Sequence, residues 1–396
     1  MRWSALCSAT TPKSPRPGVV HRRLAVYRCR GIDHGRRLHV PVLDVRPPER
    51  RGLTPWYPTA PWAQPLEDFM PTTLGSLRRL VLSPSLESAT FERRGFPALP
   101  GATAEHLEAI PQAVICGFEW GIDTRSQWEL ERRLSLVTPE HIGFAYEGAT
   151  MACTVLDAMR GGRGHKTRDL LSGPGQPHIF LAYIGIGFAM ARLPRPLWKR
   201  VVPDLTTSAY HPVMSWLAVD GYGFDRAYFE TRKWVDEQKV PAAYPWRDRP
   251  EYFHRAVDQG IGRALWFIHG GLPDGVANAV GEFAPGRHAD LWSGAGLAAT
   301  FAGGADADGL RALRKLAGDH RAQLALGMVF AVKARSHAGF IPDHSAAAAR
   351  ILGDLSVSSA VRLADDTATA EKPGTPDPAY ELWRRAIAAH FSALPA

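Results

Sequence analysis

Two stretches of this 396-residue chain are rough copies of each other, and this internal repeat restricts the fold more than any other feature. The first copy is Gly185-Ile-Gly-Phe-Ala-Met-Ala-Arg192, and the second is Gly260-Ile-Gly-Arg-Ala-Leu-Trp-Phe267. A tryptophan and a glycine-rich block follow each copy. A fixed internal period indicates repeated supersecondary units.

Two weaker copies extend the repeat in both directions. One surrounds Gly117 and the other surrounds Gly327, so that units begin near residues 117, 185, 260 and 327. Spacings of this kind suit helical units joined by loops of variable length. We therefore predict an all-α protein in which about four repeated helical pairs form a superhelical or toroid-like array.

A dinucleotide-binding turn is the competing interpretation of the first copy, because Ile179–Ile184 resembles a strand and Gly185-x-Gly187 begins a fingerprint. That fingerprint requires a third glycine, which is absent here. The second copy follows Tyr252-Phe-His-Arg-Ala-Val-Asp-Gln259, which is too polar for a buried parallel strand. The repeat therefore favours helices, with glycines where two helices approach closely.

The charge and proline content divide the chain into a short first part and a long body. Residues 1–69 hold 12 Lys and Arg against 5 Asp and Glu, together with 10 of the 32 prolines. We interpret them as a disordered extension or as the product of an upstream start codon. Residues 70–396 hold 35 basic against 34 acidic side chains, so the body shows no excess charge for nucleic-acid binding.

The body itself divides into three predicted segments. Residues 70–364 form the helical repeat domain, and residues 365–378 form a linker rich in proline and small polar residues. Residues 379–396 form a C-terminal helix, with Asp377 as its N-cap and Pro378 at its first helical position.

The apolar segments favour a cytoplasmic protein with no membrane partner. The longest apolar run, Ile179 to Ala191, is shorter than the roughly 20 residues of a membrane-spanning helix, and it predicts a buried core helix. The first residues lack the apolar run of a signal peptide. The four cysteines are widely spaced and contain no Cys-x-x-Cys, so we expect reduced, inert thiols.

Polar groups stand among small and apolar residues in three blocks of the repeat. A carboxylate in such a place can act as a general acid or base, and it can equally be the partner of a buried arginine, as Glu147 could be of Arg263. The candidate catalytic residues are Glu147, Asp220, Asp258 and Arg263. The candidate substrate-binding residues are Tyr146, Tyr222 and Trp292. The recurring tryptophans have core packing as their first interpretation and an apolar ligand cavity as their second.

Motifs for other chemistries are missing from the sequence. It contains no His-Glu-x-x-His, no Gly-x-Ser-x-Gly and no Walker loop. The histidines His141, His178, His211 and His288 each stand apart from other ligand residues along the chain. We therefore predict no metal and no cofactor.

Several ordered blocks carry a resemblance to a known family. They are Leu80-Val-Leu-Ser-Pro84, Thr90-Phe-Glu-Arg-Arg-Gly-Phe96, Gly143-Phe-Ala-Tyr-Glu-Gly-Ala149, Asp220-Gly-Tyr-Gly-Phe224, Asp258-Gln-Gly-Ile-Gly-Arg263 and Asp290-Leu-Trp-Ser-Gly-Ala-Gly-Leu297. Over residues 70–360 the chain resembles a bacterial family catalogued as domain of unknown function 1702, which is associated with enediyne biosynthesis and includes the UnbL-like proteins.

The resemblance implies a pathway and no mechanism. It implies an accessory protein of enediyne (polyketide) biosynthesis whose partner is a polyketide intermediate or the polyketide synthase. Such a protein could be an enzyme that acts on a polyene or cyclised intermediate in an apolar channel. It could instead be a non-enzymatic helical-repeat scaffold or binding protein that docks on the synthase or holds its product.

Overall fold

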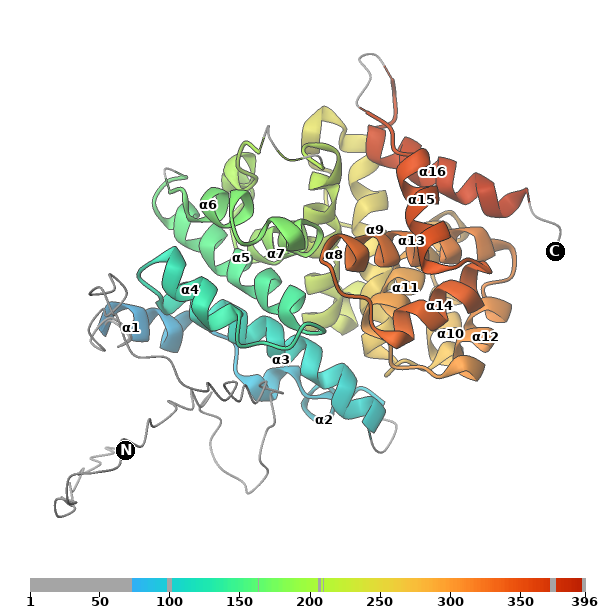
Figure 1. The fold of residues 1–396 in the computed structure, drawn as a ribbon, viewed down its shortest axis with the longest axis horizontal. Coiled ribbons are helices and arrows are strands. Elements are labelled where there is room, and N and C mark those ends of the chain that lie inside the picture. The colour runs from blue at the N-terminus through green and yellow to red at the C-terminus, as the bar shows by residue number, and fades with distance from the viewer. Residues whose placement is uncertain are drawn as a thin grey trace, which may run out of the picture.

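The computed structural model describes residues 73–97, 102–162, 164–205, 208, 210–370 and 375–393. All the regular elements of these residues are helices, which confirms the all-α class (Figure 1). The predicted extension, residues 1–69, lies outside the described residues, as do residues 371–374 of the predicted linker.

The body is built on long helices that pack in chain order, each against the next (Figure 1). These central helices are α3 (Ala102–Asp123), α5 (Ile142–Met159), α7 (Ile179–Met190), α8 (Leu217–Phe229), α9 (Pro250–Ile268), α11 (Pro285–Ala302) and α13 (Arg321–His337). The other α-helices are α1 (Thr73–Leu82), α2 (Phe91–Arg94), α4 (Gln127–Leu134), α6 (Lys166–Ser172), α10 (Pro273–Glu282), α12 (Ala307–Leu316), α14 (Asp343–Gly353), α15 (Val357–Asp366) and α16 (Ala379–Ser392).

The repeated glycines lie inside the central helices, at the contacts between neighbours. A Cβ atom added to Gly185 of α7 would lie 2.1 Å from the carbonyl oxygen of Glu147 in α5. One added to Gly260 of α9 would lie 1.8 Å from the carbonyl oxygen of Asp220 in α8. The sequence-based preference for helix packing over a nucleotide-binding turn is therefore confirmed, because only glycine permits this approach of two backbones.

Helix α5 and the segment before it, near the start of the series, also contact the last two central helices, α11 and α13. The phenyl rings of Phe144 in α5 and Phe301 in α11 are in edge contact, with centroids 5.3 Å apart. The Arg335 guanidinium of α13 donates a hydrogen bond to the carbonyl oxygen of Glu140, just before α5, at 2.7 Å. The apolar side chains between the helices form one core.

Helix α7 is the most apolar of the central helices, and every one of its residues is buried. This confirms the expectation of a core helix for Ile179 to Ala191, because α7 covers Ile179–Met190 and Ala191 is its C-cap. None of the helices among the described residues is both long and apolar enough to span a membrane.

The predicted start of the C-terminal helix differs from the structure. Helix α16 begins at Ala379, with Pro378 rather than Asp377 as its N-cap. The carboxylate of Asp377 instead accepts a hydrogen bond from Arg385, eight residues further along, at 2.7 Å.

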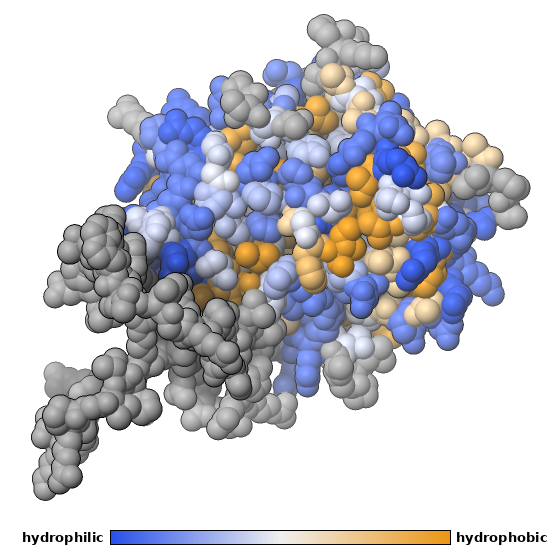
Figure 2. Space-filling model, in the orientation of Figure 1, coloured by the Kyte–Doolittle hydropathy of each residue, from blue (hydrophilic) through white to orange (hydrophobic). Residues whose placement is uncertain are grey.

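Hydrophilic residues cover most of the described surface on the face that Figure 2 shows. Hydrophobic residues gather there over the C-terminal helices near α13 and α14 (Figures 1 and 2). The large apolar side chains with more than half of their surface exposed are few, and Leu77 and Leu80 of α1 are two of them.

Candidate functional site

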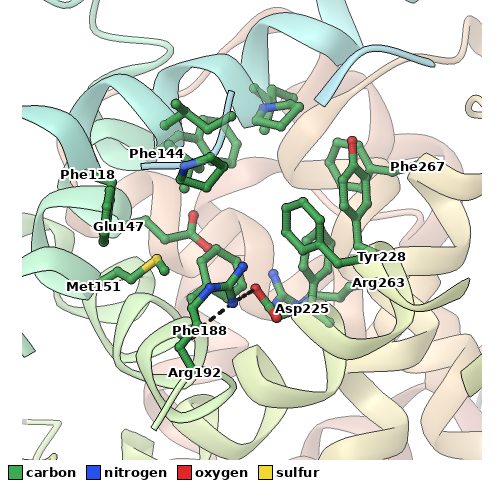
Figure 3. A pocket seen from close by; sticks show the side chains of 17 residues that line it. Phe118, Phe144, Glu147, Met151, Phe188, Arg192, Asp225, Tyr228, Arg263 and Phe267 are labelled. Atoms are coloured by element: carbon green, nitrogen blue, oxygen red, sulfur yellow. Dashed lines mark hydrogen bonds and ion pairs between the residues drawn. The ribbon is translucent and has the colours of Figure 1, made fainter. Parts of the chain in front are cut away.

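Two adjoining apolar cavities lie between the central helices, and we call them the two lobes of one site because they share wall residues. One lobe, of about 70 Å³, is bounded by α3, α5, α7, α8 and α9 (Figure 3). The other, of about 50 Å³, is bounded by α5, α7, α8, α9, α11, α13 and α16. The two lobes share Phe144, Glu147, Arg263 and Phe267 as walls. Each lobe exceeds the roughly 15 Å³ that one water molecule needs, so the cavity can hold water or a narrow apolar ligand.

Glu147 is the only carboxyl group that borders both lobes among the described residues. It comes from the buried middle of α5, and its carboxyl group points toward the centre of the cavity (Figure 3). No hydrogen bond to this carboxyl group is present in the described part of the chain. Burial raises the pKa of Glu147 to about 8, an effect that Arg263 opposes and Asp220 reinforces. The group is therefore mostly protonated at neutral pH.

Arg263 and Asp220 form a buried ion pair beside Glu147. The guanidinium of Arg263, from α9, meets the carboxylate of Asp220, from α8, with its Nε at 2.7 Å and its Nη2 at 2.6 Å from the same oxygen. Burial raises the pKa of Asp220, and the Arg263 charge and hydrogen bond oppose that rise. Because a buried arginine and a buried carboxylate each need a partner, the pair stays ionised together.

The glycine contacts position these three residues. Gly260 stands one turn before Arg263 in α9 and lies directly against the backbone of Asp220 in α8. Gly185 of α7 lies in the same way against the backbone of Glu147 in α5. The repeat therefore matters to the site, because close backbone contact brings the polar residues of successive units to one cavity.

A second ion pair stands at the wall of the first lobe, and sequence reasoning did not select it. The guanidinium of Arg192 pairs with the buried carboxylate of Asp225 (Figure 3). The Arg192 side chain keeps 35% of its surface exposed, so this wall is close to solvent. The signal that could have found the pair was its position, since Arg192 ends the first repeat copy and Asp225 follows Phe224 of the glycine-rich block.

Asp258 does not join the cavity group, and its proposed catalytic role has no geometric support. It precedes Gly260 on α9, and its carboxylate forms a bidentate ion pair with Arg287 of α11. The Nη2 atom of Arg287 lies 2.6 Å from Oδ1 of Asp258, and its Nε atom lies 3.0 Å from Oδ2. Residues five apart on a helix point in different directions, which places Asp258 and Arg263 on different faces of α9. Neither Asp258 nor Arg287 borders the two lobes.

The three residues suggested for substrate binding also lie away from the cavity walls. Tyr146 stacks on His178 with ring centroids 4.6 Å apart, and Tyr222 packs edge-on against Trp198 at 5.0 Å. Trp292 is buried, with 4% of its surface exposed. The aromatic walls are formed mainly by phenylalanines, and Tyr146, Tyr222 and Trp292 are not among the residues that border the two lobes.

The structure brings together one group of metal-type ligands that spacing along the chain did not indicate. One ligand atom from each of His106, Glu140 and His344 lies within 4.8 Å of the other two. The three residues come from distant parts of the sequence, which is why a search for short motifs misses them.

Both cysteines that the structure describes, Cys116 and Cys153, are buried, and they form no disulfide with each other. Burial raises the pKa of Cys153 to about 12, so that its thiolate is scarce at neutral pH.

Comparison with protein families gives the relation of the chain to known sequences. The model of the family described as protein of unknown function (DUF1702) matches residues 73–391. The chain belongs to this family. Every residue of the cavity, from Pro84 to Tyr380, lies within the matched range, so the cavity is part of the family domain. No curated protein and no solved structure matches the chain.

Proposed function

We propose that this protein is an accessory enzyme of enediyne biosynthesis that transfers a proton to or from a polyene or cyclised polyketide intermediate. The single observation that carries this proposal is the protonated, unpartnered carboxyl group of Glu147 inside an apolar cavity. The pathway rests on the family resemblance of the sequence blocks. A cytoplasmic location agrees with both.

Glu147 is suited to general acid–base chemistry. Its pKa of about 8 lies near neutral pH, where a group can both give and take a proton. A proton given to one carbon of a conjugated chain and removed from another shifts the double bonds and conserves all atoms. The phenylalanine walls, such as Phe144 and Phe267, give the reacting chain apolar surroundings, and the Asp220–Arg263 pair provides a fixed charge distribution beside it.

The helical arrangement supports a channel for an extended molecule. We interpret the central helices as about four repeated units placed around the cavity in a toroid-like array. Two lobes that share Glu147 and Arg263 would place these residues near the middle of a narrow ligand. The polyketide synthase would supply the ligand, either by releasing an intermediate into solution or by passing it on while the two proteins are docked.

A binding protein without catalysis is the second candidate. It is favoured by the ion pairs at the cavity, because Arg263 with Asp220 and Arg192 with Asp225 already neutralise each other. In this case the cavity would hold a reactive polyene away from water.

Gene deletion with metabolite profiling, followed by complementation, separates the two candidates. Glu147→Gln keeps the size and the neutral charge of the protonated side chain but cannot transfer a proton. If the protein is an enzyme, we expect the deletion strain and the Glu147→Gln strain to accumulate the same altered intermediate. The exposed Glu282→Gln is the matched control and should restore the wild-type products.

Two outcomes would contradict the enzymatic proposal. Full restoration of products by Glu147→Gln would remove the proposed acid–base role. A lower titre without any new intermediate would favour the binding protein. Co-purification with the polyketide synthase would test the docking partner separately.

A further inference from the structure

His106, Glu140 and His344 meet where the first and last parts of the fold come together. His106 belongs to the first turns of α3, Glu140 precedes α5, and His344 belongs to the first turn of α14. Their three ligand atoms lie within 4.8 Å of one another, and all three residues are partly buried. None of them borders the cavity around Glu147.

Both imidazole rings are held in one orientation by the end of α11. The Nε2 atom of His106 lies 2.6 Å from the carbonyl oxygen of Ala302, and the Nε2 atom of His344 lies 3.2 Å from that of Phe301. A carbonyl oxygen can only accept, so each Nε2 carries the proton and donates it. Each neutral ring therefore keeps its lone pair on Nδ1. Metal-binding histidines are commonly fixed in this way, with the other ring nitrogen bonded to a backbone carbonyl.

Glu140 supplies the carboxylate of the group. Its Oε1 atom lies 3.7 Å from Nδ1 of His344, the nitrogen that carries the lone pair. The backbone of Glu140 is held by the hydrogen bond from Arg335 to its carbonyl oxygen. A tetrahedral zinc ion with bonds of about 2.1 Å sets its ligand atoms about 3.4 Å apart. Small side-chain rotations are enough to close the group around such an ion.

The three residues leave one coordination position of a tetrahedral ion open, and a third histidine lies close to the group. His141 follows Glu140, and its ring centroid lies 6.3 Å from that of His106. Its Nδ1 atom is hydrogen-bonded to Thr138, while its buried Nε2 atom has no hydrogen-bond partner among the described residues. A water molecule or, after a larger movement, His141 can complete the coordination.

We propose that His106, Glu140 and His344 bind a divalent transition metal ion, with zinc as the expected ion, which joins the beginning and the end of the helical domain. Two imidazole nitrogens and one carboxylate suit zinc, whereas calcium and magnesium prefer oxygen ligands alone. The bound ion connects α3, the segment before α5, and α14. Because the ligands are far apart in sequence, binding is coupled to the folded state and stabilises it. The positive charge of Arg335 nearby lowers the affinity and does not remove the ligand set.

Zinc titration of the full-length protein tests the site. After treatment with EDTA and removal of the chelator, we expect calorimetry to give one zinc ion per chain. The midpoint of thermal unfolding should rise with zinc concentration, because the ion binds the folded state. Cobalt(II) should bind in the same place and show the visible absorption of a low-symmetry nitrogen and oxygen site.

The double variant His106→Gln, His344→Gln provides the decisive comparison. Glutamine can still donate to the Ala302 and Phe301 carbonyl oxygens, so the hydrogen bonds of the fold are retained, but the ligand nitrogens are lost. We expect at least about 100-fold weaker zinc binding and no thermal shift. His390→Gln, an exposed histidine of α16, should bind zinc like the wild type.

Circular dichroism and thermal unfolding without zinc verify that the double variant folds. A folded double variant that binds one zinc ion with wild-type affinity would overturn the proposal. A wild-type protein that binds neither zinc nor cobalt(II) at millimolar concentration would also overturn it. Neither result depends on the function proposed for the Glu147 cavity.

Discussion

Glu147 and Asp220 face the same buried guanidinium, and only Asp220 bonds to it. Arg263 places its Nε and Nη2 atoms on one oxygen of Asp220, within 2.7 Å. One positive charge cannot compensate two buried carboxylates, so the carboxyl group without the direct contact keeps its proton. Burial raises the pKa of Glu147, and the direct bond to Arg263 goes to Asp220 instead, so Glu147 is neutral where Asp220 is ionised.

Glu147 should make the protein less stable as the pH rises. Its pKa is about 8 in the folded state against 4.5 as the ordinary value. Below about pH 4.5 the group is protonated in both states. Between there and about pH 8 only the unfolded chain releases the proton, so stability falls by up to about 1.4 kcal/mol per pH unit. Above pH 8 the penalty stays constant.

Urea unfolding of Glu147→Gln at pH 5, 7 and 8.5 isolates this effect. Glutamine carries no titratable proton, so the variant should gain stability relative to the wild type between pH 5 and pH 8.5. Glu282→Gln, on the exposed end of α10, should run parallel to the wild type. A difference between Glu147→Gln and the wild type that does not change with pH would contradict the raised pKa.

Glycine contacts determine how the central helices pack. Each glycine costs roughly 0.5–1 kcal/mol in a helix interior relative to alanine. In return, the backbones of neighbouring helices touch, as Gly223 of α8 does against Val257 of α9 and Gly296 of α11 does against Leu324 of α13. The same kind of contact recurs along the series of central helices, and this explains why glycines recur in the sequence repeat.

Gly260→Ala and Gly281→Ala should have opposite effects on stability. The added methyl group at Gly260 would lie 1.8 Å from the carbonyl oxygen of Asp220, so α8 and α9 must separate. We expect a loss of about 1–3 kcal/mol or more in the free energy of unfolding. At Gly281 of α10 nothing lies within 4 Å of the added atom, so alanine should be neutral or stabilise by up to about 1 kcal/mol.

Chemical denaturation of both glycine variants gives the measurement. Movement of Asp220 would also disturb its pair with Arg263, so Gly260→Ala should impair the activity of the cavity together with stability. A Gly260→Ala protein as stable as the wild type would show that the helices are not in close contact there.

The whole molecule is held at its C-terminal end by a buried network that joins distant segments. Arg384 of α16 bonds to Asp290 of α11 at 3.1 Å, and Arg255 of α9 bonds to Glu381 of α16 at 2.7 Å. Tyr252 of α9 donates a further hydrogen bond to Glu381 at 2.8 Å. Helix α16 is therefore part of the domain, which agrees with a family match that extends to residue 391.

Arg384→Ala should destabilise the protein far more than the change at the next residue. Loss of Arg384 leaves Asp290 and Glu381 with too little positive charge in a buried place, at a cost of about 3–5 kcal/mol. Arg385 also contacts Glu381, but its side chain is 55% exposed, so Arg385→Ala should cost at most about 1 kcal/mol. Thermal and urea unfolding of the two variants compare them, and equal losses would argue against the network.

Local pattern was sufficient for the class of the fold and for part of the site. The polar run before the second repeat copy excluded a strand, and the apolar run from Ile179 predicted a core helix, because both depend on neighbours in the chain. Glu147, Asp220 and Arg263 were selected because each stands among small residues in its block. The local pattern did not indicate that Asp258 lies outside the cavity group, since the arginine that pairs with it, Arg287, lies on another helix.

The sequence by itself determined that the chain is helical, where its close helix contacts lie, and which polar residues are candidates for a buried site. The reason is that helix periodicity, the positions of glycines and the charges among apolar residues can all be recognised within a few consecutive residues. Only the tertiary structure decided which carboxyl group pairs with Arg263, that Arg192 and Asp225 stand at the cavity, and that His106, Glu140 and His344 meet. These relations join residues that are remote in the chain, and no local pattern encodes them because they arise when the last helices pack against the first.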